Sequence, residues 1–510
     1  MLSKIKSMSL LGVDGYFVDV QVDVTGGLPS WEVVGLPDTS VRESKERVKA
    51  AIQNSGIEFK SRKIVVNLAP AYTKKEGPAF DLPIAVGILM DIGEIEHQIL
   101  DDYIFIGELS LDGSLNRVNG ILPMCIEAYN LGIKKVIIPY ENRLEAGTIN
   151  GLEVYPAKSL RDVINHLNSD VLLEKYSTNV DEIFHQLNNH QIDFSEVKGQ
   201  EGVKRALEIA AAGAHNCLLI GSPGSGKTML ARRIPTILPD LNFEEALEIT
   251  KIHSIAGILP SDKPFVTTRP FRAPHHTVSG VALSGGGRIP KPGEMSLAHY
   301  GVLFLDELPE FNRNSLEVMR GPLEDRQITV SRASCTLTYP CNFMFIASMN
   351  PCPCGYASST DKKCTCNEFQ IAKYMSKISG PLLDRIDIHI DVSPVKYDKL
   401  NSDIKSESSA DIKKRVDEVR LLQQERYKEY KIFSNSELTP TMLEEFCKLD
   451  SISKRIMEKA FEKLGLSARA YGRILKVSRT IADLAKSKDI KSEHVSEAIQ
   501  YRTLDRKYMK

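Results

Sequence analysis

The alternation of apolar and polar positions divides the 510-residue chain into segments with strand-like or helix-like periods. In the first third, the strand-like segments are Tyr16–Val24, Lys63–Leu68 and Lys135–Ile138, and the helical segments are Val41–Asn54 and Leu82–Met90. A mixture of the two periods, divided by turn residues, is typical of an α/β domain. We predict such a domain over residues 1–168, followed by a polar, Asn-rich linker over residues 169–193.

Beyond the linker the strand-like segments become short and continuously apolar. They are Cys217–Ile220, Val302–Leu305 and Phe343–Ala347, and the first is preceded by a helical segment with an apolar face at Val203, Ala206, Leu207, Ala210 and Ala211. Short apolar runs of this kind are consistent with buried strands. We predict an α/β/α core over residues 194–395.

The C-terminal part of the chain is helical in its spacing and more charged. A charged helix with the narrow apolar stripe Ile412, Val416 and Val419 follows a Ser-rich segment, and we predict a linker and charged helix over residues 396–437. Apolar residues share one helical face at Ile474, Val477, Ile481, Leu484 and Ala485. This spacing predicts a helical domain over residues 438–510.

Composition narrows the class of protein without identifying it. The length suggests about two to four domains, and the formal net charge of −1 excludes a generally basic surface, so contacts with nucleic acid would need local patches. No run of about 18 apolar residues is present, and the short apolar stretch Met8–Val13 has no signal-peptide cleavage site. We therefore expect no membrane span, a cytoplasmic location and nine reduced cysteines.

One motif carries specific chemistry. A phosphate loop of the pattern G-x-x-x-x-G-K-T lies between an apolar strand and a helical segment, and consists of Gly221, Ser222, Pro223, Gly224, Ser225, Gly226, Lys227 and Thr228. Its backbone N–H groups surround a polyphosphate, Lys227 reaches the β- and γ-phosphates, and the Thr228 hydroxyl binds Mg²⁺. We therefore predict that the chain binds ATP with Mg²⁺.

Two carboxylates end the apolar run Val302–Leu305. In open α/β sheets, ligands bind at the carboxyl ends of the strands. We predict that Asp306 holds Mg²⁺ and that Glu307 polarises the attacking water. The alternative is a plain buried strand that ends in an acidic turn.

Three further polar residues suit a nucleotide site. Asn350 ends the strand-like run Phe343–Ala347 and is positioned to orient water, although a turn Asn before Pro351 is the alternative. Arg385 is a candidate arginine finger for a neighbour's γ-phosphate, or else a partner of Asp384 or Asp387 in an ion pair. Arg469 begins a C-terminal helix and would close that helical domain onto the bound nucleotide. Arg473 is the other candidate for this role.

Four cysteines lie within fifteen residues, at Cys352, Cys354, Cys364 and Cys366. Four thiolates suit the tetrahedral geometry of a structural Zn²⁺ site. Reversible disulfides and plain reduced thiols are the alternatives. A metal here would lie between Asn350 and Arg385 in the sequence and would position both.

These motifs together resemble those of the AAA+ ATPases. Val197–Gln200 is similar to the leader segment near adenine, Asn350 to sensor 1, Arg385 to the finger and Arg469 to sensor 2. The segments Pro270–His276, Pro292–His299 and Ser379–Arg385 are similar to the magnesium-chelatase-like branch, and most of the chain resembles its YifB/ComM family. The resemblance implies an AAA+ core with an insert in its second helix, a hairpin before sensor 1 and a C-terminal helical lid.

The family also implies a partner. Members similar to ComM are described as hexameric DNA helicases of branch migration in transformation, and a finger arginine fits a head-to-tail ring. Two loops are expected to face the pore: the hairpin Gln327–Tyr339, with Arg332, and the loop Gly285–Lys291, with Arg288 and Lys291. We predict that these three cations contact DNA phosphates, with ordinary solvated loops as the alternative.

The N-terminal domain is similar to the Lon protease domain, through Lys75–Ala79, Gly107–Gly113 and Gly132–Pro139. Lon-type proteolysis needs a Ser nucleophile and a Lys base. The matching positions here are Ala79 and Met124, so we expect a Lon-like fold without peptidase activity, unless a shifted alignment brings Ser110 or Ser114 into play.

The sequence thus favours an ATP-hydrolysing ring motor on DNA. The alternative is a magnesium-chelatase-like ATPase that remodels a protein or metal-insertion partner.

Overall fold

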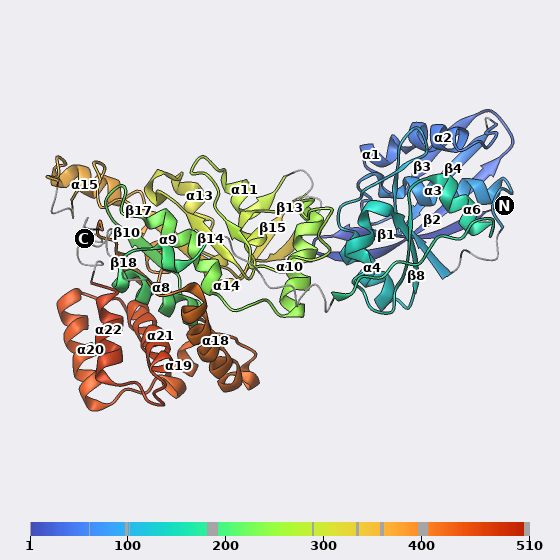
Figure 1. Cartoon of the computed structure of the whole chain (residues 1–510). Coiled ribbons are helices and arrows are strands. Elements are labelled where there is room, and N and C mark those ends of the chain that lie inside the picture. The colour runs from blue at the N-terminus through green and yellow to red at the C-terminus, as the bar shows by residue number, and fades with distance from the viewer. Residues whose placement is uncertain are drawn as a thin grey trace. The chain divides into compact units, whose positions relative to one another are not determined.

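The computed structural model (Figure 1) describes residues 2–60, 62–96, 100, 102–180, 192–287, 290–332, 336–357, 362–395 and 406–503. The chain forms two compact units. Unit 1 consists of residues 1–187 with 243–267, and unit 2 consists of residues 188–242 with 268–510. Among the described residues, no helix is both long and apolar enough to cross a membrane.

The described residues of unit 1 form three small sheets, of four, three and two strands, and helices pack against them. Its strands are β1 (Ser3–Leu11), β2 (Asp14–Thr25), β3 (Ser30–Val34), β4 (Lys63–Ala69), β5 (Tyr103–Phe105), β6 (Glu108–Leu109), β7 (Leu115–Asn116), β8 (Lys135–Pro139) and β9 (Glu153–Ala157). Its helices are α1 (Thr39–Arg42), α2 (Ser44–Asn54), α3 (Asp81–Asp91), α4 (Ile121–Asn130), α5 (Arg143–Ala146), α6 (Leu160–Leu167) and α10 (Phe243–Ala256). The predicted strands correspond to β2, β4 and β8, whereas the predicted helix Val41–Asn54 is divided into α1 and α2.

The first sheet has the order β1-β2-β4-β3, and the second, which is parallel, has the order β5-β8-β9. Alternate residues of β2 are buried, among them Val18, Val20 and Val22, and α3 packs on the same sheet. Because every second side chain of a strand points to the same face, these valines lie on one face of β2, and that face is buried.

One segment folds outside the boundaries predicted for the core. Residues 243–267 pack with unit 1, where α10 lies on α4. The buried Ser254 hydroxyl donates to Glu145 Oε2 at 2.6 Å, and Arg117 Nη2 donates to the Leu259 carbonyl at 2.7 Å. The apolar spacing of α10 predicts a helix but cannot say which unit it covers. Its contacts with α4 assign it to unit 1.

Unit 2 contains a five-stranded parallel sheet with the order β11-β14-β17-β10-β18. Its strands are β10 (Cys217–Ile220), β11 (Phe271–Arg272), β14 (Val302–Leu305), β17 (Met344–Met349) and β18 (Ile388–Asp391). Two hairpins lie between strands of this sheet in the sequence and form separate two-stranded sheets. They are β12 (Gly285–Gly286) with β13 (Lys291–Pro292), and β15 (Gln327–Ser331) with β16 (Thr336–Pro340). The short helices near the sheet are α8 (Glu201–Gly213), α9 (Lys227–Arg233), α11 (Gly280–Ser284), α12 (Glu294–Leu297), α13 (Arg313–Glu317), α14 (Pro322–Asp325), α15 (Glu368–Met375) and α16 (Gly380–Leu383).

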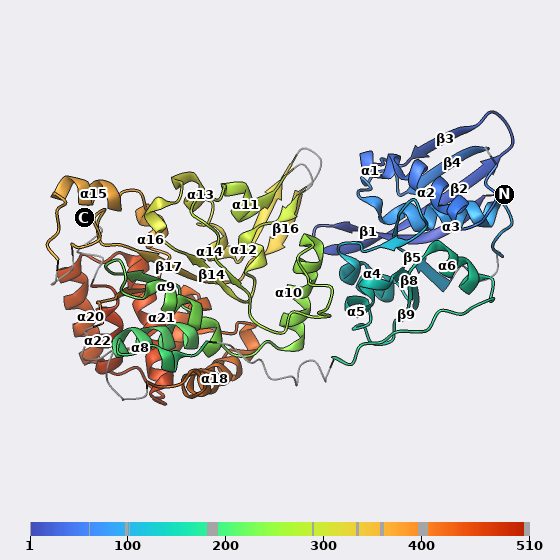
Figure 2. The same cartoon turned by 45° about the horizontal axis from the view of Figure 1, so that its top comes forward.

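The C-terminal helices pack directly on this core rather than forming a separate compact unit. They are α18 (Ser409–Arg426), α19 (Pro440–Phe446), α20 (Ser451–Leu464), α21 (Ala468–Leu484) and α22 (Ser492–Gln500). Figure 2 shows them gathered beside α8, which α18 and α21 both contact. The apolar stripe Ile412, Val416 and Val419 is buried there, so the segment predicted as a linker with a charged helix contributes to the core; its residues 396–405 lie outside the described part.

A buried carboxylate joins the sheet to these helices. Asp387, just before β18, accepts a hydrogen bond from the Asn216 backbone N–H at 3.1 Å and forms an ion pair with Arg473 of α21 at 2.6 Å. Burial favours the neutral acid, but Arg473 and the nearby His215 hold the pKa of Asp387 well below its usual range. The carboxylate therefore stabilises the fold while it is ionised.

We expect Asp387→Asn to destabilise unit 2 by about 3–5 kcal/mol, because the substitution leaves Arg473, whose side chain is only 17% exposed, without its carboxylate partner. A carboxyl whose pKa is depressed on folding contributes stability above its unfolded pKa of about 3.9 and loses it as the pH falls. Urea unfolding between pH 7 and pH 3 should therefore show a smaller acid loss for Asp387→Asn than for the wild type. Asp489→Asn, at an exposed position, is the control, and equal stability of all three proteins would contradict the prediction.

Candidate functional site

The phosphate loop connects β10 to α9 as the sequence predicts. Gly224 and Gly226 have φ angles of +77° and +88°, in the left-handed region that glycine tolerates best, and α9 begins at Lys227. Lys227 Nζ donates to the carbonyl oxygens of Gly221 at 2.8 Å and Ser222 at 3.0 Å. Burial lowers the pKa of Lys227, and the carboxylates of Asp306 and Glu307 oppose that shift.

The predicted Mg²⁺ ligands lie together. Thr228 Oγ1 donates to Asp306 Oδ2 at 2.7 Å, so a hydroxyl from α9 and a carboxylate from the end of β14 lie side by side. Hard oxygen ligands of these two kinds are the ones Mg²⁺ prefers, and the pair therefore fits the predicted metal. Buried Ser348 of β17 also donates to Asp306, and this contact holds the carboxylate in place.

Glu307 follows Asp306 in an unusual backbone conformation. Its φ is +54°, in the left-handed region, which costs a residue other than glycine about 1–3 kcal/mol. Its backbone N–H donates to Asp306 Oδ1 at 3.1 Å, and its side chain is exposed. The strained turn therefore directs one carboxylate to the metal position while the other faces solvent.

Asn350 completes this group of side chains. It follows β17, and its Oδ1 accepts a hydrogen bond from Lys227 Nζ at 3.2 Å. Gln200, in the predicted leader segment, has a φ of +60° and donates from Nε2 to the Ser225 carbonyl of the phosphate loop at 2.7 Å. The structure thus brings together the phosphate loop, both acidic residues and Asn350.

The sequence reasoning missed Ser348 and the loop contact of Gln200. Ser348 was detectable as a polar residue in an otherwise apolar strand next to Asn350. The contact of Gln200 was not detectable, because it joins positions 25 residues apart through a side-chain rotamer.

The predicted finger and sensor-2 arginines lie near one another. Arg385 is buried, with Nη2 2.8 Å from Glu324 Oε2 and Nη1 donating to the Pro381 carbonyl at 2.7 Å. Arg469 is 61% exposed and lies 3.8 Å from Asp384, the residue before Arg385. Arg473, the other candidate for the sensor-2 role, pairs with Asp387 and is 17% exposed, so Arg469 is the more exposed of the two arginines. The roles of Arg385 and Arg469 remain predictions.

The two hairpins with candidate DNA contacts are neighbours. The Tyr339 hydroxyl of β16 donates to the Pro290 carbonyl at 2.8 Å, and a Cβ built on Gly286 would lie 2.8 Å from Arg332 Nη2. Lys291 is exposed on β13, whereas Arg288 lies outside the described residues. Arg332 and Lys291 thus come from adjacent hairpins although 41 residues separate them in the sequence.

The cysteine cluster, Cys352, Cys354, Cys364 and Cys366, has its four sulfur atoms within 4.8 Å of one another. The Sγ atom of Cys354 lies 3.3 Å from that of Cys352 and 3.5 Å from that of Cys364. Tetrahedral Zn–S bonds of about 2.3 Å require S···S edges of about 3.8 Å, so the arrangement fits zinc. All four are free thiols, and backbone N–H groups of Thr365 and Tyr356 lower the pKa of Cys354 to about 5.

The positions that match the Lon dyad are apolar and buried. Ala79 and Met124 belong to one hydrophobic cluster, so no nucleophile or base is present at either position. The nearby hydroxyl of Ser114 donates to Asp112 at 2.7 Å, and that of Ser110 accepts from Asn116 at 2.8 Å. Both hydroxyls are thus paired with groups that hold the β6–β7 turn, where neither partner is a lysine.

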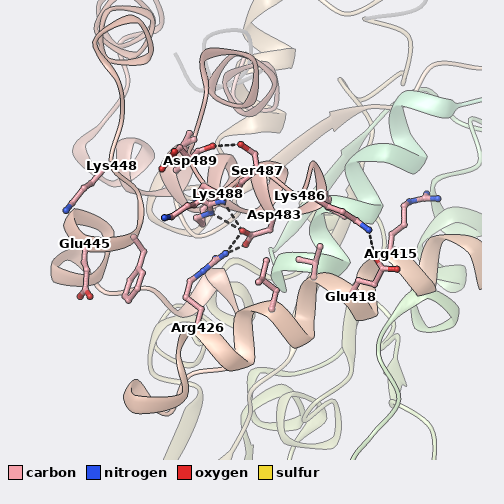
Figure 3. A pocket seen from close by; sticks show the side chains of 16 residues that line it. Arg415, Glu418, Arg426, Glu445, Lys448, Asp483, Lys486, Ser487, Lys488 and Asp489 are labelled. Carbon is pink, nitrogen blue, oxygen red and sulfur yellow. Dashed lines mark hydrogen bonds and ion pairs between the residues drawn. The ribbon is translucent and has the colours of Figure 1, made fainter.

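A cavity of about 820 Å³ lies among the C-terminal helices (Figure 3). On one side Arg426 forms a two-point contact with Asp483, at 2.6 and 2.9 Å, and on the other Lys486 pairs with Glu418 at 2.8 Å. None of the residues of the nucleotide site lines it. We therefore assign this cavity no role in nucleotide binding.

Models of magnesium-chelatase proteins match three parts of the chain. "Magnesium chelatase, subunit ChlI" matches residues 193–400, "Subunit ChlI of Mg-chelatase" matches residues 20–142, and "Magnesium chelatase, subunit ChlI C-terminal" matches residues 406–502. The first of these ranges includes the phosphate loop, both acidic residues, Asn350 and the cysteine cluster.

Relatives match the chain over its whole length. "Uncharacterized protein YifB" of Escherichia coli is 43% identical over 506 residues, 99% of this chain and 98% of its own. "Competence protein ComM" of Haemophilus influenzae is 41% identical over 509 residues, again 99% and 98%. "Lon protease 2" of Bacillus subtilis is 28% identical over 170 residues, 30% of each chain. The chain therefore belongs to the YifB/ComM family of magnesium-chelatase-like AAA+ proteins.

Proposed function

We propose that the protein is an ATP-hydrolysing ring motor that moves DNA. The observation that carries the ATPase part is the convergence of Lys227, Thr228, Asp306, Glu307 and Asn350 at one edge of the parallel sheet. Membership of an AAA+ family supports the same activity.

Each of these side chains has a chemical task. The phosphate loop holds the β- and γ-phosphates with its N–H groups, and Lys227 leaves its contacts with Gly221 and Ser222 to bind a phosphate oxygen. Thr228 and Asp306 hold Mg²⁺, which neutralises charge on the phosphates. Glu307 accepts a proton from the attacking water, and Asn350 orients that water.

The ring part rests on Arg385 and Arg469. In one chain Arg385 is held by Glu324, whose side chain is 49% exposed. We infer that a neighbouring subunit's phosphates compete with Glu324 for this guanidinium, and that Arg469 reaches the same shared site. A head-to-tail contact that closes makes a ring, for which we propose a hexamer.

The DNA part rests on the adjacent hairpins that carry Lys291 and Arg332. Contacts with DNA phosphates need cationic side chains on exposed elements. Each subunit of the proposed ring would contribute its own Lys291 and Arg332. The relative named for competence, ComM, is consistent with work on DNA. A magnesium-chelatase-like remodelling ATPase is the alternative, for which ATPase activity would respond to a protein partner and not to DNA.

We also propose that the cysteine cluster holds one structural Zn²⁺ ion. Its support is the set of S···S distances and the N–H donors to Cys354. Thiolate sites and ATP hydrolysis both suit the reducing cytoplasm, where we place the protein.

Lys227→Ala is expected to abolish ATP binding, because it removes the cation of the phosphate loop. Glu307→Gln should keep ATP binding but lower kcat about 100-fold or more, since the general base is lost. Nucleotide-binding titrations and phosphate-release assays measure the two effects. Glu310→Gln, an exposed carboxylate three residues further on, is the matched control; a Glu307→Gln enzyme as fast as this control would contradict the assignment.

The double substitution Lys291→Ala and Arg332→Ala should weaken DNA binding at every sequence. It should also flatten the plot of log K against log salt by roughly 1.5 per engaged chain, for two lost phosphate contacts. Binding to forked DNA and DNA-stimulated ATPase activity measure this, with Lys459→Ala on exposed α20 as the control. Unchanged binding and stimulation would count against these hairpins, and an ATPase indifferent to DNA would favour the remodelling alternative.

Metal analysis of protein purified without chelators should find one zinc per chain. Cys364→Ser is expected to lose it and to lower the thermal stability of unit 2, because structural zinc stabilises small sites by about 10–16 kcal/mol. Cys447→Ala, at a buried cysteine outside the cluster, should retain the metal. A wild-type protein without zinc would show that the four thiols serve another purpose.

A further inference from the structure

The cysteine cluster packs against the phosphate loop. Gly355, the residue after Cys354, lies so close to Pro223 that a Cβ built on it would be 2.5 Å from Cδ and 2.7 Å from Cγ of the proline ring. Carbon atoms in ordinary van der Waals contact are about 3.5–4.0 Å apart. Only glycine therefore allows this approach between the two loops.

The local backbone also requires glycine. Gly355 has a φ of +85°, and its N–H donates to the Cys352 carbonyl at 2.9 Å, which closes a tight turn between the first two cysteines. The position of Gly355 thus depends on the positions of Cys352 and Cys354. Anything that holds these two sulfur atoms also holds the surface that Pro223 touches.

The cysteine cluster is also close to the nucleotide site in the sequence. Cys352 is fully buried two residues after Asn350, at the end of β17, which pairs with the strand that leads into the phosphate loop. Burial raises the pKa of Tyr374 on α15, just after the last cysteine, and the nearby Asn350 backbone N–H opposes that shift. In the sequence the cluster therefore lies between Asn350 and the helix that carries Tyr374.

Little apolar burial holds the cluster itself. Of its cysteines only Cys352 is buried, and residues 362–369 are exposed or half-buried. A short segment with so little core depends on a cross-link for a defined conformation. The bonds between one metal ion and four sulfur atoms would provide that cross-link.

We propose that the metal-bound cysteine cluster is a support for the phosphate loop, so that occupancy of the metal site determines the affinity for ATP. Gly355 and Pro223 are the positioning residues that transmit this effect. The inference rests on the proposed ATPase activity and zinc site, and adds the regulation of ATP binding by the metal.

The supporting contact should affect the KM for ATP more than kcat. The phosphate loop holds the phosphates in both the ground state and the transition state, and loss of such uniform binding raises KM with little change in kcat. We expect Gly355→Ala to retain one zinc per chain and to raise the KM for ATP about tenfold. Removal of zinc from the wild type with a zinc-selective chelator, in excess Mg²⁺, should raise KM at least as much.

Gly465→Ala is the matched control. Gly465 also has a positive φ, +63°, but a Cβ there would meet no atom within 4 Å. It therefore carries the same backbone strain without the contact and should keep the wild-type KM. Pro223→Ala completes a double-mutant cycle: combined with Gly355→Ala it removes the clashing ring, so the pair should bind ATP more tightly than Gly355→Ala alone.

The outcomes separate the inference from the proposed function. A zinc-loaded Gly355→Ala protein with the KM of Gly465→Ala would overturn the inference, as would an unchanged KM after zinc removal, and both leave the ATPase intact. Additive effects in the cycle would also overturn it, because the two residues would then act independently. ATPase activity that survives Lys227→Ala would overturn the proposed function and the inference with it.

Discussion

The site depends on the parallel pairing of β10 with β17 and of β17 with β14. Parallel strands place their carboxyl ends at the same edge, so the residues that follow them meet although the chain separates them widely. In this way Lys227 donates a hydrogen bond to Asn350, and the next residue, Thr228, donates one to Asp306. Asp306 and Asn350 directly follow buried strands, and Lys227 follows the loop that leaves β10, so burial of those strands determines where the polar residues lie.

In the described part of unit 2, the buried Asp387 and Arg385 each have an oppositely charged partner. Asp387 is ionised against Arg473 and His215 and fastens the C-terminal helices to the sheet. Arg385 is held in the same region by Glu324. The difference between the two pairs is exposure: both members of the first are largely shielded from water, whereas Glu324 is half exposed. Solvent therefore reaches the second pair at Glu324, since the Arg385 side chain is itself only 8% exposed.

In the N-terminal unit, apolar packing occupies the positions that match the Lon dyad. Ala79 and Met124 belong to one apolar cluster with residues such as Ile104 and Val136. The same unit holds the segment 243–267 through the buried contact of Ser254 with Glu145. A part of the chain that lies between the phosphate loop and the rest of the ATPase core in sequence is thereby anchored in the other unit.

The sequence by itself determined the phosphate loop, the acidic pair, Asn350 and the grouping of four cysteines, because each depends on neighbouring residues and local spacing. Apolar periods likewise predicted β2, α3, β10, β14 and α18 without any tertiary information. Only the tertiary structure decided that α10 packs in unit 1, that Ser348 holds Asp306, that Arg473 is engaged by Asp387, and that Gly355 touches Pro223. These are contacts between residues far apart in the chain, and they follow from the order of strands and the packing of side chains, which no local pattern encodes.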